Sequence, residues 1–142
     1  MKDEIKLVRD FQEKVKSPLD LKGMDSKVLE TRMKILIEEV KELADASEGC
    51  SKAFNVVTVA HMLKELGDVQ CAVIGFAETF GLPLTDSFNE VMKSNMTKDP
   101  TNETGKAIKG EGYVEANLIP EAVKVVSRVR GFLIDSGDYG LD

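Results

Sequence analysis

The segment LIEEVKELADA, residues 36–46, carries four carboxylates on about two and a half turns of an expected helix. Glu38, Glu39 and Glu42 share one arc of that helix, because steps of three or four residues return close to the starting direction. Asp45 continues the acidic run. Like charges at these spacings repel each other by about 0.2 to 0.5 kcal/mol. The acids therefore either face water, which screens them, or surround a cation.

A second acidic pair, Glu65 and Asp68, lies one turn apart within the apolar segment VAHMLKELGDVQCAVIGF, residues 59–76. Acids are rarely buried without a partner, so a pair inside an otherwise apolar helix needs an explanation. Twenty-two residues separate Glu42 from Glu65, which is enough for one helix to end, a short turn and an antiparallel return. The two acidic arcs can therefore meet face to face.

Carboxylates that converge in this way cannot all stay ionised without raised pKa values or bound divalent cations. Ligands that are all oxygen favour Mg²⁺ or Mn²⁺ over zinc. A solvated acidic face is the alternative, and the spacing alone leaves both interpretations open. A di-iron bundle is disfavoured, because it needs two Glu-x-x-His motifs and His61 lies four residues before Glu65. His61 either packs structurally or supports a ligand.

Hydrophobic residues at helical spacing predict an all-α fold, an antiparallel bundle in one domain over residues 1–142. The second helix should begin at an N-cap of Asp25 or Ser26 and stop at Gly49. Gly67 and Gly75 interrupt the third helix and should allow close approach of a backbone or ligand. Two long helices, one of them apolar over much of its surface, need more cover than the short ones provide, so dimerisation should complete a four-helix core. The five helices are expected at about 3–15, 27–47, 55–80, 85–96 and 120–135.

The composition is that of a soluble globular protein, with 42% hydrophobic and 31% charged residues among 142. A balance of 19 basic and 25 acidic residues, net charge −6, makes nucleic acid and anionic membranes poor partners. The longest apolar run, CAVIGFA, is far too short to cross a bilayer, and the N-terminus lacks a signal-peptide core, so we expect a cytoplasmic protein. Cys50 and Cys71 have no CxxC spacing and should be reduced thiols.

The acidic motifs resemble those of the MazG-like all-α nucleoside triphosphate pyrophosphatases, a group that includes dimeric dUTPases and phosphoribosyl-ATP pyrophosphohydrolases. The family pattern is EExxE followed by ExxD on the next helix, and this chain reads EEVKE at 38–42 and ELGD at 65–68. The stretches VRDFQEK, RMKILIEEVKEL, SNMTK and GKAIKGEGY are also similar to the family, so the resemblance covers about residues 5–118. The helix after Pro120 lies outside it.

The resemblance implies hydrolysis of a nucleoside triphosphate, often a deoxynucleotide or a non-standard one, to the monophosphate and pyrophosphate, as nucleotide-pool house-cleaning. It also implies Mg²⁺, with Mn²⁺ as a substitute, and a homodimer or dimer of dimers. A phosphoribosyl-ATP pyrophosphohydrolase and a non-catalytic helical interaction module are the alternatives. Glu38 would be the general base or a further ligand, and the metal ligands would be Glu39, Glu42, Glu65 and Asp68.

A Gly- and Lys-bearing loop follows the fourth helix and is too long for a plain connector. Its lysines could supply the positive charge that a triphosphate needs from an acidic chain, although solvated lysines are the simpler interpretation. In the first helix, Phe11 and Gln12 are candidates to stack on and hydrogen-bond a base, and Phe11 fits a core stripe better. The expected substrate-binding residues are Asn95, Lys98, Lys106, Lys109 and Tyr113.

Overall fold

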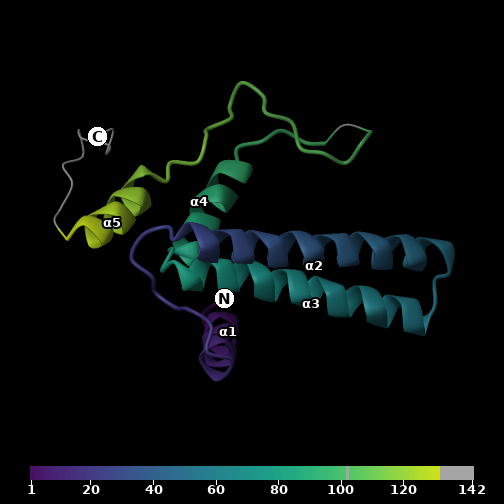
Figure 1. Cartoon of the computed structure of the whole chain (residues 1–142). Coiled ribbons are helices and arrows are strands. Elements are labelled where there is room, and N and C mark those ends of the chain that lie inside the picture. Colours follow the sequence, from purple (N-terminus) through teal and green to yellow (C-terminus); the bar gives the residue numbers. More distant parts are fainter. Residues whose placement is uncertain (102, 132–142) are drawn as a thin grey trace. The chain divides into compact units, whose positions relative to one another are not determined.

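The computed structural model describes residues 1–101 and 103–131, and five helices account for most of them (Figure 1). No strand occurs in this part of the chain, where an isolated antiparallel bridge joins Asp99 and Ile108. The predicted all-α class is confirmed. None of the described helices is long and apolar enough to cross a membrane. The helices are α1 Lys2–Lys14, α2 Ser26–Lys52, α3 Val56–Thr79, α4 Leu84–Asn95 and α5 Ile119–Arg130.

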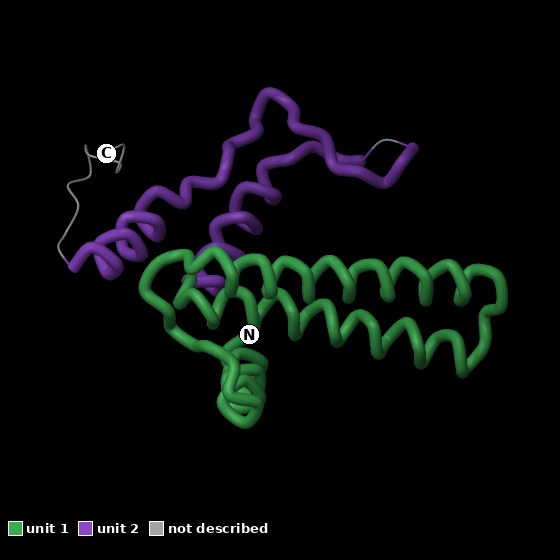
Figure 2. Tube along the Cα trace, viewed as in Figure 1, with its two compact units in different colours: residues 1–82 green, residues 83–142 purple. Residues whose placement is uncertain are grey.

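The chain forms two compact units, Met1–Leu82 and Pro83–Asp142 (Figure 2). The first holds α1, α2 and α3, and the second holds α4 and α5. Each unit is described by itself below. The assignment of the whole chain to one domain stays a prediction.

Helices α2 and α3 run side by side as an antiparallel hairpin with a short connection (Figure 1). Asp25 starts α2, because its Oδ1 accepts hydrogen bonds from the backbone N–H groups of Lys27 and Val28 at 3.0 and 3.1 Å. Asn55 and Thr58 start α3 with a reciprocal capping box. Each cap satisfies backbone N–H groups that have no partner within the helix, and the cap at Asp25 is one that the sequence predicted.

Gly49 does not end α2, so that prediction is wrong: the helix continues for almost one further turn to Lys52. Cys50 is buried within the extension, and Lys52 pairs with Glu48 at 2.9 Å, one turn earlier. These contacts outweigh the modest cost of one interior glycine, about 1 kcal/mol. At the other end of the chain, α5 ends at Gly131 with a left-handed φ of 78°, and the expected extension to 135 lies outside the described residues.

Helix α1 packs on the C-terminal part of α3 and buries Gln12 rather than Phe11. Gln12 is 2% exposed, whereas Phe11 is 53% exposed. The Nε2 group of Gln12 donates to Thr79 Oγ1 at 3.0 Å and to the Pro18 carbonyl at 3.1 Å. The expected core position of Phe11 is therefore wrong. The hydrogen bonds of Gln12 determine which side of α1 faces α3.

A second link between the same elements runs through Arg9. Its guanidinium pairs with Asp20 at 2.6 Å and with Glu78 at 3.4 Å. These two acids raise the pKa of Arg9, with the Asp20 hydrogen bond as the largest cause. Through these ion pairs, Arg9 of α1 binds both the loop after α1 and the end of α3. The pairs therefore fix the position along α3 at which α1 crosses it.

Gly75 and Gly67 of α3 differ in what surrounds them, and this gives a matched test of the packing. A Cβ on Gly75 would lie 2.9 Å from Gln12 Oε1 and 3.4 Å from Arg32 Nη1, whereas one on Gly67 would meet nothing within 4 Å. Close approach thus occurs at Gly75 and not at Gly67, and it involves side chains rather than the predicted backbone or ligand.

We expect Gly67→Ala to raise the free energy of unfolding by up to about 1 kcal/mol, through helix propensity. Gly75→Ala should lower it by about 1 kcal/mol, because overpacking against the pinned Gln12 typically costs about 1 to 3 kcal/mol. Chemical denaturation of both variants measures the difference. Equal stability of the two variants would show that the side chains of Gln12 and Arg32 move away from an added Cβ at no cost in stability.

Candidate active site

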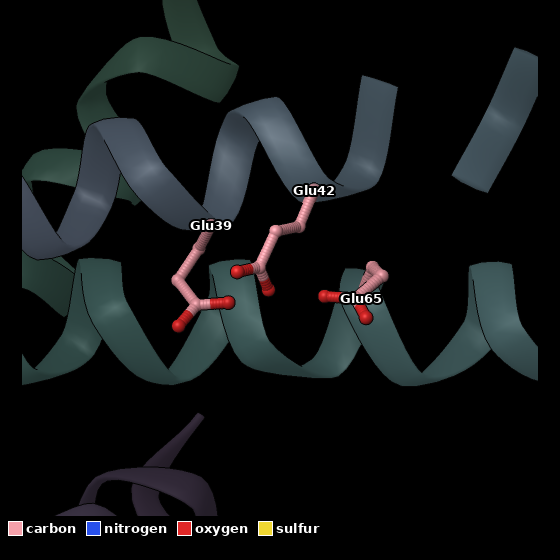
Figure 3. A group of neighbouring side chains, drawn as sticks. All are labelled: Glu39, Glu42 and Glu65. Carbon is pink, nitrogen blue, oxygen red and sulfur yellow. The ribbon is translucent and has the colours of Figure 1, made fainter. Parts of the chain in front are cut away.

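Three glutamates from the two long helices of the first unit form an acidic group. Glu39 and Glu42 extend from α2 toward α3, where they meet Glu65 (Figure 3). One carboxylate oxygen of each lies within 4.8 Å of the other two. Glu65 is 3% exposed, Glu39 is partly buried and Glu42 is exposed. The predicted meeting of the two acidic arcs is therefore observed for these three residues.

The group is electrostatically strained without a cation. Repulsion from Glu39, followed by burial and by Glu65, raises the pKa of Glu42. The Oε2 atoms of Glu39 and Glu65 are buried, and neither has a hydrogen-bond partner among the described residues. Leaving a buried acceptor unpaired costs about 1 to 3 kcal/mol. A hard divalent cation would satisfy both atoms and offset the repulsion, so this all-oxygen donor set fits Mg²⁺ or Mn²⁺.

Two basic side chains of α3 border the group. Lys64 Nζ lies 2.7 Å from Asp68 Oδ2 and 3.3 Å from Glu65 Oε1, and these hydrogen bonds raise the pKa of Lys64. His61 Nε2 lies 3.2 Å from the same Glu65 oxygen. Lys64 was not among the predicted site residues, although its spacing of four residues from Asp68 is a readable signal for an ion pair.

Two predicted site residues stay outside the group of three. Asp68 pairs with Lys64 instead, and Glu38 is exposed on α2. A role for Asp68 as a ligand requires Lys64 to release it, which an exposed lysine can do at small cost. The assignment of both residues to the site stays a prediction.

A sequence model of the MazG nucleotide pyrophosphohydrolase domain matches residues 27–102. The match covers more than half of the 142 residues. The chain belongs to this family. Comparison with curated proteins gave no match. Because the family is one of nucleotide pyrophosphohydrolases, this MazG domain is an enzyme that acts on a nucleotide, and all three glutamates of the acidic group lie within the matched residues.

The predicted substrate-binding residues all belong to the second unit of the chain, and three of them, Lys106, Lys109 and Tyr113, lie beyond the matched residues. Asn95 is the last residue of α4, and the bridge between Asp99 and Ile108 closes the loop that follows, with N···O distances of 2.8 and 3.2 Å. Lys109 Nζ lies 5.0 Å from the centroid of the Tyr113 ring, a cation–π contact. Lys98 is partly buried and Lys106 is exposed. Their role in binding phosphates stays a prediction.

Proposed function

We propose that this MazG domain hydrolyses a nucleoside triphosphate, a deoxynucleotide or a non-standard one, to the monophosphate and pyrophosphate in an Mg²⁺-dependent reaction. Such an activity would clear unwanted nucleotides from the cellular pool. The observation that supports it is the group of Glu39, Glu42 and Glu65 across the helix hairpin, inside the matched segment. Clustered carboxylates with unpaired buried oxygens are what a triphosphate-bound Mg²⁺ requires.

The roles divide between ligands and a base. Glu39, Glu42 and Glu65 would hold the cation, and Asp68 would join them once Lys64 moves away. When bound, Mg²⁺ neutralises charge on the phosphates and lowers the pKa of water. Glu38 is exposed and lies on the same helical arc as Glu42, and its carboxylate would accept a proton from the attacking water.

Lysines of the loop after α4 would supply positive charge for the triphosphate. Lys98, Lys106 and Lys109, with Asn95 as a donor and Tyr113 at the rim, would hold the β- and γ-phosphates, which leave as pyrophosphate. In the first unit, Gln12 would contact the base, and the exposed ring of Phe11 is available to stack on it.

The direct test is a panel of purified ribo- and deoxynucleoside triphosphates, damaged nucleotides and phosphoribosyl-ATP, incubated with Mg²⁺ and analysed by chromatography. We expect monophosphate and pyrophosphate in equal amounts from at least one nucleoside triphosphate. Turnover of phosphoribosyl-ATP alone would favour the alternative substrate. Release of orthophosphate with a diphosphate would contradict attack at the α-phosphorus.

A homodimer, or a dimer of dimers, would complete the helical core. Large apolar side chains on α2 and α3 remain exposed, at fractions of 37 to 85%. Exposed apolar side chains, where they form one continuous surface, mark an interface in soluble proteins. Light scattering should give a multiple of the 15.6 kDa chain mass, and a purely monomeric mass would contradict the proposal. The exposed residues are Met33, Ile37, Val40, Val56, Val57, Leu63, Leu66 and Val73.

Replacing Lys109 tests the proposed phosphate contacts. We expect Lys109→Ala to raise KM by about tenfold or more with a smaller change in kcat, because hydrogen bonds to charged groups contribute about 1.5 to 3 kcal/mol. Lys124→Ala is the control, since Lys124 is an exposed lysine of the same unit on α5. Steady-state kinetics measures both. If KM and kcat stay unchanged in Lys109→Ala, Lys109 does not contact the substrate.

A further inference from the structure

Lys64 of α3 bridges the two acids of the ELGD motif. Its Nζ donates to Asp68 Oδ2 at 2.7 Å and to Glu65 Oε1 at 3.3 Å. The side chain of Lys64 is 64% exposed, whereas Glu65 is buried. The other carboxylate oxygen of Glu65, Oε2, is buried without a hydrogen-bond partner among the described residues. The ammonium therefore pairs with the solvent side of a carboxylate whose inner side belongs to the acidic group.

The charge of Lys64 also reaches the acids of α2. Repulsion from Glu39 is the largest cause of the raised pKa of Glu42, and the charge of Lys64 acts in the opposite direction. Lys41 provides a contrast on α2. It is adjacent to Glu42 in the sequence and exposed, but it forms no ion pair with any residue that the structure describes. Lys64 is thus a counter-ion that is held in direct contact with the acidic group.

The two carboxylates that Lys64 contacts are also proposed ligands of the divalent cation. An ammonium at hydrogen-bond distance from these oxygens would repel a divalent cation bound to them. Lys64 must therefore leave Glu65 and Asp68 when the cation binds, and its long, exposed side chain allows this movement. A displaced ammonium loses two charge-assisted hydrogen bonds and needs new acceptors. The triphosphate that binds with the cation offers anionic oxygens at the same place.

We propose that Lys64 exchanges partners when substrate binds: it neutralises Glu65 and Asp68 in the metal-free protein and donates to phosphate oxygens of the triphosphate in the loaded one. The proposal rests on the proposed function, which places the triphosphate at these carboxylates. Lys64 is then a substrate-binding residue of the first unit. The exchange makes a cation without phosphates bind more weakly, because that cation displaces Lys64 and supplies no new acceptor. Cation and triphosphate therefore favour each other's binding.

The test measures the two halves of the exchange apart, with Mn²⁺ alone and with inorganic tripolyphosphate at saturating Mn²⁺. Lys64→Met keeps the length of the side chain and removes its charge. We expect the variant to bind Mn²⁺ about three- to tenfold more tightly than the wild type, because a competing positive charge is gone. Tripolyphosphate should bind at least about fivefold more weakly, because a charged donor is lost. The EPR signal of free Mn²⁺ and calorimetry measure the two dissociation constants.

Lys64→Arg and Lys41→Met are the matched controls. Arginine keeps the charge and the donors at position 64, so both dissociation constants should stay within about threefold of the wild-type values. Lys41→Met removes a charge that is close to Glu42 in the sequence but forms no ion pair with the described residues. Both constants should again stay within about threefold, because solvent and salt screen a charge that has no direct contact.

Three results would overturn the proposal. Equal effects of Lys41→Met and Lys64→Met would reduce the role of Lys64 to its charge at a distance. Unchanged Mn²⁺ binding in Lys64→Met, or no Mn²⁺ binding by the wild type, would show that Lys64 does not compete with a cation. Tighter Mn²⁺ binding with unchanged tripolyphosphate binding would show that Lys64 does not reach the phosphates.

Hydrolysis of nucleoside triphosphates by the same proteins separates this proposal from the proposed function. The expected binding pattern, without hydrolysis of any nucleoside triphosphate by the wild type, would support the exchange of partners and contradict the function. Hydrolysis by the wild type, together with unchanged binding constants in Lys64→Met, would contradict the exchange alone.

Discussion

Glu39→Gln is expected to reduce kcat/KM for nucleotide hydrolysis by more than about 100-fold, because even residues that only orient metal ligands contribute about 10- to 100-fold. The same substitution should raise the Tm of the metal-free protein. Glu39 is the largest cause of the raised pKa of Glu42, so neutralising it removes repulsion that the folded state bears. Pyrophosphate release and thermal denaturation measure the two effects, which have opposite signs.

Glu48→Gln is the matched control for that experiment. Glu48 is exposed on the same helix, nearly two turns beyond Glu42, and pairs with Lys52. The substitution should leave hydrolysis unchanged and alter stability by less than about 0.5 kcal/mol. Wild-type turnover in Glu39→Gln would place the chemistry away from this hairpin. A lower Tm in that variant, without metal, would show that Glu39 is held by a favourable contact instead.

Adding Mg²⁺ with a nucleotide should raise the Tm of the wild-type protein by roughly 5 to 10 °C when both are near 100 times their dissociation constants. Binding to the folded state alone contributes about 2.7 kcal/mol at that excess, and about 1 kcal/mol shifts the Tm of a domain of this size by a few degrees. A bound cation would also relieve the repulsion among Glu39, Glu42 and Glu65. Removing the metal with a chelator should reverse the shift.

Glu39→Gln serves as the control for the metal response, because it lacks one ligand charge and starts with less repulsion. Its Tm should respond to Mg²⁺ much less than that of the wild type. Scanning fluorimetry of both proteins, with Mg²⁺ alone and with Mg²⁺ plus nucleotide, provides the comparison. An equal shift in the two proteins would mean that the cation binds elsewhere.

The sequence was sufficient to predict the helices and the meeting of Glu42 with Glu65. Helical periodicity assigns residues to faces, and a short connection forces the two long helices to return antiparallel. The outcome at Gly49 shows the limit of local signals. A glycine disfavours the helix by only about 1 kcal/mol. Burial of Cys50 and the Glu48–Lys52 pair stabilise the helix beyond Gly49 by more than that cost.

Tertiary structure alone decided which groups are paired and which remain free. Periodicity placed Phe11 and Gln12 on neighbouring directions of α1, but the crossing of α1 over α3 determined that Gln12 is buried. Likewise, Asp68 belongs to the acidic motif by its spacing, but it pairs with Lys64 at 2.7 Å and is not part of the group of Glu39, Glu42 and Glu65. Sequence spacing defines a direction around a helix axis. Hydrogen bonds and charge pairs with neighbouring elements determine what that direction faces.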